Sequence, residues 1–173
     1  QILNGEDPKM YELAIDNEGN KARLAALMKK AEKGGSFVIG AIGGSITKGE
    51  GASGEKRRYV NHVFNWWKEN FPKATFTLVN AGIGASNAEM ACYRLETDLL
   101  SHNPDFVIVD FSVNTYLNND QIGTYQTLLY KIMSQKNNPA VMSVHFTSTV
   151  AAEYEKGGKA VRANVYPNDQ IKA

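Results

Sequence analysis

The chain has 173 residues, of which 43% are hydrophobic and 10% aromatic, so it is long enough for one buried core and too short for two ordinary domains. Lysine and arginine total 19 against 18 acidic residues, and this balance argues against a partner such as nucleic acid or an anionic membrane surface. No apolar run reaches the roughly 18 residues that a membrane span needs. We therefore expect a single soluble domain over residues 1–173, secreted or cytoplasmic, with a small neutral or polar ligand.

The predicted elements alternate between helix and strand along the chain. The first is a helix that ends near residues 34–35, and its apolar positions are Leu24, Leu27, Met28 and Ala31. Four apolar runs of strand length follow, at residues 37–42, 76–79, 106–111 and 140–146. Helical stripes separate them, at Tyr59, Val60, Val63, Phe64 and Trp67, at Met90, Tyr93, Leu95 and Leu99, and at Ile122, Tyr125, Leu128, Leu129 and Ile132. This alternation predicts an α/β flavodoxin-like three-layer sandwich, with a parallel sheet in the order 2-1-3-4 and room for a fifth strand.

Three loops rich in small residues follow the first three predicted strands, at residues 43–47, 80–86 and 112–115. Because the carboxyl ends of parallel strands meet at one edge of a sheet, we expect these loops to lie together. Small residues let the backbone turn sharply and bring its N–H groups close to a ligand, which is what an oxyanion site requires.

The first loop carries a recognisable motif. Gly43-Gly44-Ser45 matches the first block of the SGNH/GDSL superfamily of serine esterases, and the chain resembles this superfamily over most of residues 36–146. The resemblance implies that Ser45 is the catalytic nucleophile. It is closest to bacterial esterases that act on acetylated carbohydrate, and it implies an acetylated sugar or another small ester as substrate, with no cofactor.

The second and third loops supply the oxyanion donors that the resemblance implies. By the spacing after Asn80, a backbone N–H donor falls on Ala85, with Gly84 just before it. The third block of the superfamily, usually Gly-x-Asn-Asp, implies that the side-chain amide of Asn114 is the second donor. Thr115 stands here in place of the expected aspartate.

The last block of the superfamily is altered in this chain. Its acid and base positions, in an Asp-x-x-His frame, are matched by Ala163 and Tyr166. A serine hydroxyl is a poor nucleophile until a nearby base takes its proton, and tyrosine, with a reference pKa of about 10, is no such base at neutral pH. The segment 147–173 is also shorter than the superfamily pattern, so we expect an atypical or shortened tail.

The histidines and the cysteine offer few further candidates. His145 follows the fourth predicted strand and is an alternative base, although two strand positions, roughly 10 Å, separate it from Ser45. His62 and His102 are predicted to lie on the surface. Cys92 is predicted to be a buried structural thiol, and three dispersed histidines with one cysteine show no metal-ligand spacing.

Each motif also has a purely structural interpretation. Ser45 is of a type that caps helices, and Asn114 of a type that ties down strand ends. Gly82 and Gly84 are typical of turns, and together they resemble the start of a dinucleotide fingerprint, whose third glycine would fall on Asn87.

Two pairs of large side chains can also be interpreted either as structural or as contacts to a ligand. We expect at least one of Trp66 and Trp67 to pack in the core rather than stack on sugar. Arg57 and Arg58 are predicted to be solvated loop charges, with contact to an anionic substrate as the alternative.

The sequence thus predicts a serine esterase of the SGNH type that deacetylates carbohydrate esters through Ser45. The alternatives are a catalytically impaired module that binds an acyl or sugar group, and an incomplete or engineered SGNH domain. A sheet with an uncovered edge also suggests a homo-oligomer formed through that edge or through the tail.

Overall fold

The structure is a computed structural model that describes residues 15, 17–114 and 119–146. Its centre is a sheet of four parallel strands in the order β2-β1-β3-β4. The strands are β1 (Gly35–Gly43), β2 (Ala74–Gly82), β3 (Phe106–Asp110) and β4 (Ala140–Ser143). The predicted α/β class, parallel pairing and strand order are confirmed.

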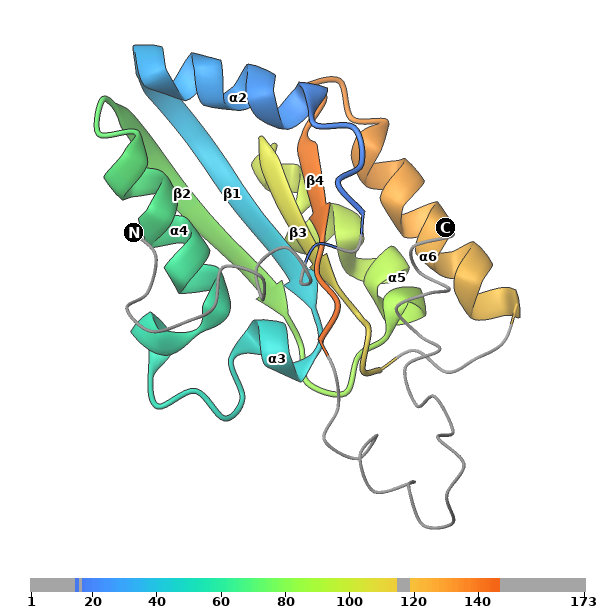
Figure 1. Cartoon of the computed structure of the whole chain (residues 1–173). Helices are drawn as coiled ribbons and strands as arrows, with labels where there is room; N and C mark the ends of the chain where they lie inside the picture. The colour runs from blue at the N-terminus through green and yellow to red at the C-terminus, as the bar shows by residue number, and fades with distance from the viewer. Residues whose placement is uncertain (1–14, 16, 115–118, 147–173) are drawn as a thin grey trace.

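Helices cover both faces of this sheet (Figure 1). One face packs against α2 (Ala22–Lys33) and α4 (Tyr59–Asn70), and the other against α5 (Ala88–Asp98) and α6 (Asn119–Met133). Short helical turns complete the described elements: α3 (Ser45–Lys48), η1 (Glu55–Arg57) and η2 (Leu100–His102). Side chains of β1 alternate between the two cores, with Ile39 and Ala41 in one and Ile42 in the other. Two hydrophobic cores therefore hold the three layers together.

Trp67 is the centre of the core beneath α4. It is 2% exposed, and its ring centroid lies 5.1 Å from that of Phe71, 5.7 Å from Phe76 and 5.6 Å from Phe106. Its neighbour Trp66 is 45% exposed. The prediction that at least one of the two tryptophans packs in the core is confirmed.

The apolar stripe predicted for the helix after β2 is wrong in part. Met90 is 49% and Tyr93 82% exposed, whereas Ala88, Ala91 and Leu95 face the core. The alanines let α5 approach the sheet and α6 closely, so the buried stripe consists mainly of small side chains. The fourth strand is also shorter than predicted, since β4 ends at Ser143.

The carboxyl ends of β1 and β2 are shaped by two glycines. Gly43 and Gly82 are partners in the parallel register. A Cβ atom built on Gly43 would lie 2.1 Å from Thr47 Oγ1, and one built on Gly82 would lie 2.2 Å from the backbone nitrogen of Lys48. The absence of side chains at these two positions lets α3 fold back onto the sheet edge, and Ser45 is the first residue of α3.

Replacing Gly82 with alanine should push α3 away from the sheet edge, because the new methyl group would overlap the Lys48 backbone. We expect the unfolding free energy to fall by about 1–3 kcal/mol, the usual range for overpacking, in urea unfolding followed by circular dichroism. The control is Gly123→Ala on the exposed face of α6, where an added Cβ meets no described atom within 4 Å. That change should instead stabilise the protein by about 0.5–1 kcal/mol. Equal stability of the two variants would contradict this account of Gly82.

Candidate active site

Ser45 lies at the carboxyl end of β1, where the chain turns into α3. Gly44 precedes it with an extended backbone (φ −85°, ψ −150°) and occupies the N-cap position, so Ser45 itself is not the cap. The turn closes quickly, because the carbonyl of Ser45 accepts hydrogen bonds from the N–H groups of Gly49 and Glu50, both at 2.9 Å. Ser45 is partly buried at this edge. The alternative that Ser45 serves as a helix cap is therefore wrong.

Asn114 lies against the Ser45 turn. It follows β3 in a turn closed by its own N–H, which donates to the Phe111 carbonyl at 3.2 Å. A Cβ atom built on Gly44 would lie 3.3 Å from both Cγ and Nδ2 of Asn114. The carboxamide of Asn114 thus packs on the backbone beside Ser45, and the structure brings together two of the residues that the sequence predicts.

The loop that carries Gly84 and Ala85 is anchored to the same turn. The N–H of Ile83 donates to the carbonyl of Gly43 at 3.0 Å, and the buried hydroxyl of Ser86 shares its proton between that carbonyl at 3.2 Å and the carbonyl of Ile83 at 2.7 Å. Ala85 has a φ of +57°, in the left-handed region, which costs a residue with a side chain about 1–2 kcal/mol. Strain of this kind is concentrated at functional sites, so the unusual backbone of Ala85 fits the role of a donor loop.

Gly84 brings a charged side chain close to this loop. A Cβ atom built on Gly84 would lie 2.7 Å from Oε1 of Glu50, so the glycine leaves room for that carboxylate. Glu50 also forms an exposed ion pair with Lys48 at 3.0 Å. Both charged groups stand at the rim of the candidate site.

Arg94 bonds to the carboxyl ends of both β1 and β2. Its guanidinium donates to the carbonyl of Ala81 at 2.6 Å and to that of Gly43 at 3.4 Å, and it pairs with Asp98 at 3.1 Å. The side chain is 14% exposed. Sequence reasoning missed this residue, because nothing in the pattern distinguishes Arg94 from the other basic residues of the chain.

Asp110 is a buried carboxylate between the Ser45 and Asn114 turns. It is 1% exposed, and its two oxygens accept hydrogen bonds from different loops: Oδ2 from Thr47 at 3.1 Å and Oδ1 from Ser112 at 3.2 Å. Thr47 Oγ1 also lies 2.9 Å from the Tyr59 hydroxyl. Because Thr47 gives its only proton to Asp110, Tyr59 is the donor in that second contact. Sequence reasoning missed Asp110 as well, although an acidic residue at the end of a fully buried strand was a usable signal.

Burial sets the protonation of this network. Desolvation raises the pKa of Asp110 above its ordinary value, although the hydrogen bonds from Thr47 and Ser112 act in the opposite direction. Burial also raises the pKa of Tyr59, and it raises the pKa of Tyr125 on α6 to about 12, with the charge of Asp110 contributing to both. Both tyrosines are therefore neutral hydroxyl donors at physiological pH.

His145 lies just beyond β4, on the far side of β3 from Ser45. Its Nε2 atom is 3.0 Å from Ser143 Oγ, and that hydroxyl in turn forms a hydrogen bond with Tyr125. The proposal that His145 is a base stays a prediction. The altered positions Thr115, Ala163 and Tyr166 lie outside the described residues.

The remaining candidates from the sequence are two histidines and two arginines. His62 and His102 are exposed, as predicted. Arg57 is exposed in η1, and Arg58 packs on Gly49 and pairs with Glu55 at 3.2 Å.

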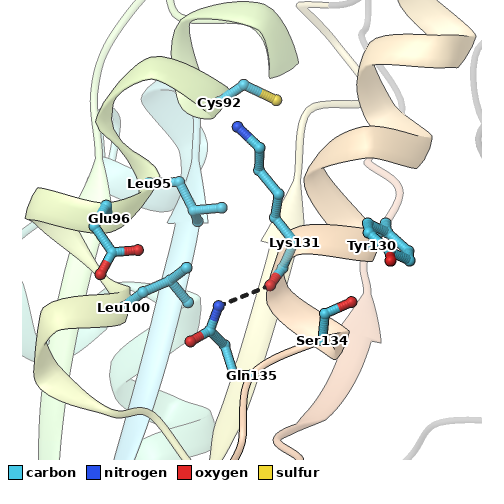
Figure 2. A pocket seen from close by; sticks show the side chains of 8 residues that line it. All are labelled: Cys92, Leu95, Glu96, Leu100, Tyr130, Lys131, Ser134 and Gln135. Atoms are coloured by element: carbon cyan, nitrogen blue, oxygen red, sulfur yellow. Dashed lines mark hydrogen bonds between the residues drawn. The ribbon is translucent and has the colours of Figure 1, made fainter.

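A separate pocket of about 330 Å³ opens between α5 and α6 (Figure 2). Its lining is Cys92, Leu95, Glu96, Leu100, Tyr130, Lys131, Ser134 and Gln135. Ser45 is not among these residues. Cys92 is partly buried there, and its thiol lies 3.7 Å from the Thr124 carbonyl. Burial raises the pKa of this thiol, so it is protonated and suits a structural role.

Over residues 15, 17–114 and 119–146, no three histidine, cysteine, aspartate or glutamate side chains are grouped in a way that would hold a metal ion. None of the helices in the described part of the chain has the length and hydropathy of a membrane-spanning segment.

Comparison with known proteins finds solved structures of carbohydrate esterases. No protein-family model matches the chain, and no curated protein matches it. A two-domain esterase active on acetylated mannans is 44% identical over 78% of this chain, with a TM-score of 0.77. The chain spans 36% of the length of that esterase. A catalytic mutant of an acetylxylan esterase from Geobacillus stearothermophilus covers 79% of this chain and 70% of its own, with a TM-score of 0.61 and 18% identity, and it therefore shows only a shared fold.

The mannan esterase has also been crystallised with mannopentaose, and that structure matches with the same 44% identity and a TM-score of 0.77. These neighbours confirm the predicted resemblance to esterases, and they are consistent with an SGNH/GDSL-like one.

The raised pKa of Asp110 predicts how stability depends on pH. The folded protein holds this proton more tightly than the unfolded chain, so the unfolding free energy should fall as the pH rises from 3.8 through the raised pKa. Asp110→Asn removes the titrating group and keeps the shape. The stability of the wild type relative to this variant should therefore be greater at about pH 4 than at about pH 8, measured by urea unfolding at each pH. The groups facing Asp110 from α4 and α6 are the neutral Tyr59 and Tyr125, which add no opposing titration in this range. A difference that stays constant with pH would contradict the prediction.

Proposed function

We propose that this chain is the catalytic domain of a serine esterase that removes acetyl groups from carbohydrate. The observation that carries the proposal is the meeting of three loops at one sheet edge. Ser45 begins α3, the amide of Asn114 packs on Gly44, and the loop with Ala85 is bonded to the carbonyl of Gly43. The 44% identity to an esterase active on acetylated mannans supports the same reaction class and makes acetylated mannan the first substrate to test.

In this proposal Ser45 Oγ attacks the acetyl carbonyl carbon. The negative charge that develops on the carbonyl oxygen is stabilised by the Ala85 N–H and the Asn114 side-chain amide. The sugar hydroxyl then leaves with a proton, and an acetyl group remains on Ser45. Water attacks this acetyl-enzyme, releases acetate and regenerates the serine.

Two features support a pre-organised oxyanion site. The backbone of Ala85 is fixed in an unusual conformation, and it lies next to Ser86, whose side chain is fully buried and bonded to two carbonyls. Asn114 is held by its turn and by contact with Gly44. Donors that need little rearrangement during the reaction are the most effective stabilisers of a transition state.

The proton on Ser45 needs an acceptor. His145 is the candidate among the described residues, and Tyr166 stands where the resemblance expects the base. The replacement of acid and base by Ala163 and Tyr166 favours a second function, a module that binds an acetylated sugar without cleaving it. Such a module would be stabilised by ligand while showing no turnover.

Labelling with a fluorophosphonate distinguishes these functions, because the probe reacts with an activated serine. Intact mass spectrometry should show one adduct on the wild type and none on Ser45→Ala, and p-nitrophenyl acetate turnover should disappear in the same variant. Ser101→Ala on the exposed η2 is the matched control and should label as the wild type does. Folded wild-type protein that takes no adduct, yet melts at a higher temperature with acetylated mannooligosaccharide, would replace the esterase proposal with the binding module.

Asn114→Ala tests the oxyanion donor. Loss of one such donor typically lowers kcat by about 10²–10³-fold. We expect a fall of that order in p-nitrophenyl acetate turnover with a much smaller change in KM, because the lost bond forms mainly in the transition state. The control is Asn87→Ala, which removes the N-cap of α5 and should cost about 1 kcal/mol of stability while leaving kcat within a few fold. A kcat of Asn114→Ala close to the wild-type value would contradict the assigned role.

A further inference from the structure

We propose that Asp110 is a positioning residue that sets the Ser45 turn and the Asn114 turn relative to each other. The inference rests on the proposed roles of Ser45 and Asn114 and goes beyond them. One carboxylate oxygen holds the first turn through Thr47, and the other holds the second turn through Ser112. Asp110 acts through the Thr47 hydroxyl and through the hydroxyl and backbone N–H of Ser112, so its effect on the reaction is indirect.

The contacts of residue 110 hold Ser45 from both sides along the chain. On the preceding side, the N–H of Gly44 donates to the backbone carbonyl of Asp110 at 3.3 Å. On the following side, the fully buried Thr47 donates to the Asp110 carboxylate at 3.1 Å. Gly43 is also the register partner of Asp110 in the sheet. The single residue 110 therefore fixes the backbone before and after the proposed nucleophile.

The second link runs to the turn of Asn114. Ser112 is 2% exposed and lies two residues before Asn114. Its hydroxyl shares one proton between Oδ1 of Asp110 at 3.2 Å and the Phe146 carbonyl at 3.0 Å, and its backbone N–H also bonds to the Asp110 carboxylate. The hydroxyl of Ser112 also accepts a hydrogen bond from the N–H of Phe146 at 2.8 Å. Ser112 is thus held by bonds to Asp110 and to Phe146. The turn that contains Ser112 is closed by the hydrogen bond from the Asn114 N–H to the Phe111 carbonyl.

The chemistry of the links explains why a carboxylate stands here. Both partners are hydroxyl donors, and a carboxylate offers an acceptor oxygen to each, whereas an amide would offer one acceptor and one donor. On the Thr47 side the direction of the proton is fixed, because Tyr59 donates to Thr47 and Thr47 donates to Asp110. Burying a carboxylate is costly, and the hydrogen bonds from Thr47 and Ser112 offset part of this cost. The same bonds tie the two turns to one residue.

The two links act in series, and this gives a specific test. Thr47→Val and Ser112→Ala each remove one hydroxyl with little change in shape, and Ser112→Ala keeps the backbone N–H bond to Asp110. If both links are needed to hold the two turns at the correct distance, a variant that breaks either link loses the positioning. A variant that breaks both links then loses little more activity. We expect each single variant to lower kcat and the fluorophosphonate labelling rate by about 10-fold to 100-fold, with KM within about twofold. The kcat and labelling rate of the double variant should be close to those of the less active single variant. They should be well above the values expected if the two losses multiplied.

Two further variants separate positioning from general loss of stability. Thr47→Ser keeps the hydroxyl and should restore most of the labelling rate. Ile132→Val removes one methylene from the core behind α6 and should cost about 0.5–1.5 kcal/mol while leaving the labelling rate unchanged. A merely structural role would instead make the labelling rate of every variant follow its stability.

A measurement without turnover keeps this inference apart from the proposed function. The side-chain amide resonances of Asn114 in ¹⁵N-edited NMR spectra should shift in Ser112→Ala and also in Thr47→Val, whose change lies in the other turn. If the wild type takes no label, the esterase proposal fails, and these resonances still decide the role of Asp110. If the wild type labels and both hydroxyl variants label at its rate, or if their losses multiply, the positioning role of Asp110 is overturned.

Discussion

The close approach of α3 to the carboxyl ends of β1 and β2 is the constraint on which the candidate site depends. Gly43 and Gly82 lie side by side in register, and a side chain at either position would overlap the turn that begins with Ser45. Because this turn folds back onto the sheet, its polar groups are removed from water and need partners within the protein. The amide of Asn80 binds the Thr47 carbonyl at 2.8 Å, and Asp110 binds the Thr47 hydroxyl. The polar network beneath the site is thus a consequence of the tight turn, and the contacts that satisfy it also hold Ser45 in place.

Much of the fold can be predicted from patterns that are local in the sequence. Continuous apolar runs predict β1 and β3 to within a few residues, because both strands lie in the middle of the sheet and are buried on both faces. The edge strand β2 is predicted less completely: residues near its start alternate between partly buried and exposed, so the apolar run 76–79 covers only part of it. The stripe predicted for α5 is wrong at Met90 and Tyr93, since this helix packs through alanines, and a pattern that gives weight to large side chains overlooks them.

The residues of the candidate site fall into two groups: those that short sequence motifs indicate, and those whose role depends on contacts distant in the sequence. Ser45, Ala85 and Asn114 belong to short motifs, so the sequence alone can nominate them. The residues that organise them act over long separations in the chain: the Arg94 guanidinium reaches a carbonyl 51 residues earlier, and the Thr47 hydroxyl reaches a carboxylate 63 residues later. A single arginine or aspartate carries no periodicity or spacing that would indicate such a contact. These residues become visible only when the strand order places β1, β2 and β3 side by side.

The two candidate functions share this geometry and differ in one component, the group that accepts the proton of Ser45. Oxyanion donors fixed by the fold stabilise a bound carbonyl oxygen weakly and a tetrahedral oxyanion strongly, and in serine hydrolases they retain about 10³-fold acceleration over water when the triad is broken. Under either proposal, the loops at this sheet edge would bind an acyl group whether turnover is fast or slow. What converts such a site into an efficient esterase is a base within hydrogen-bond distance of Ser45. Strand order bears on which residue that is: β3 lies between β1 and β4, and Nε2 of His145 forms a hydrogen bond with Ser143, whose hydroxyl also bonds to Tyr125.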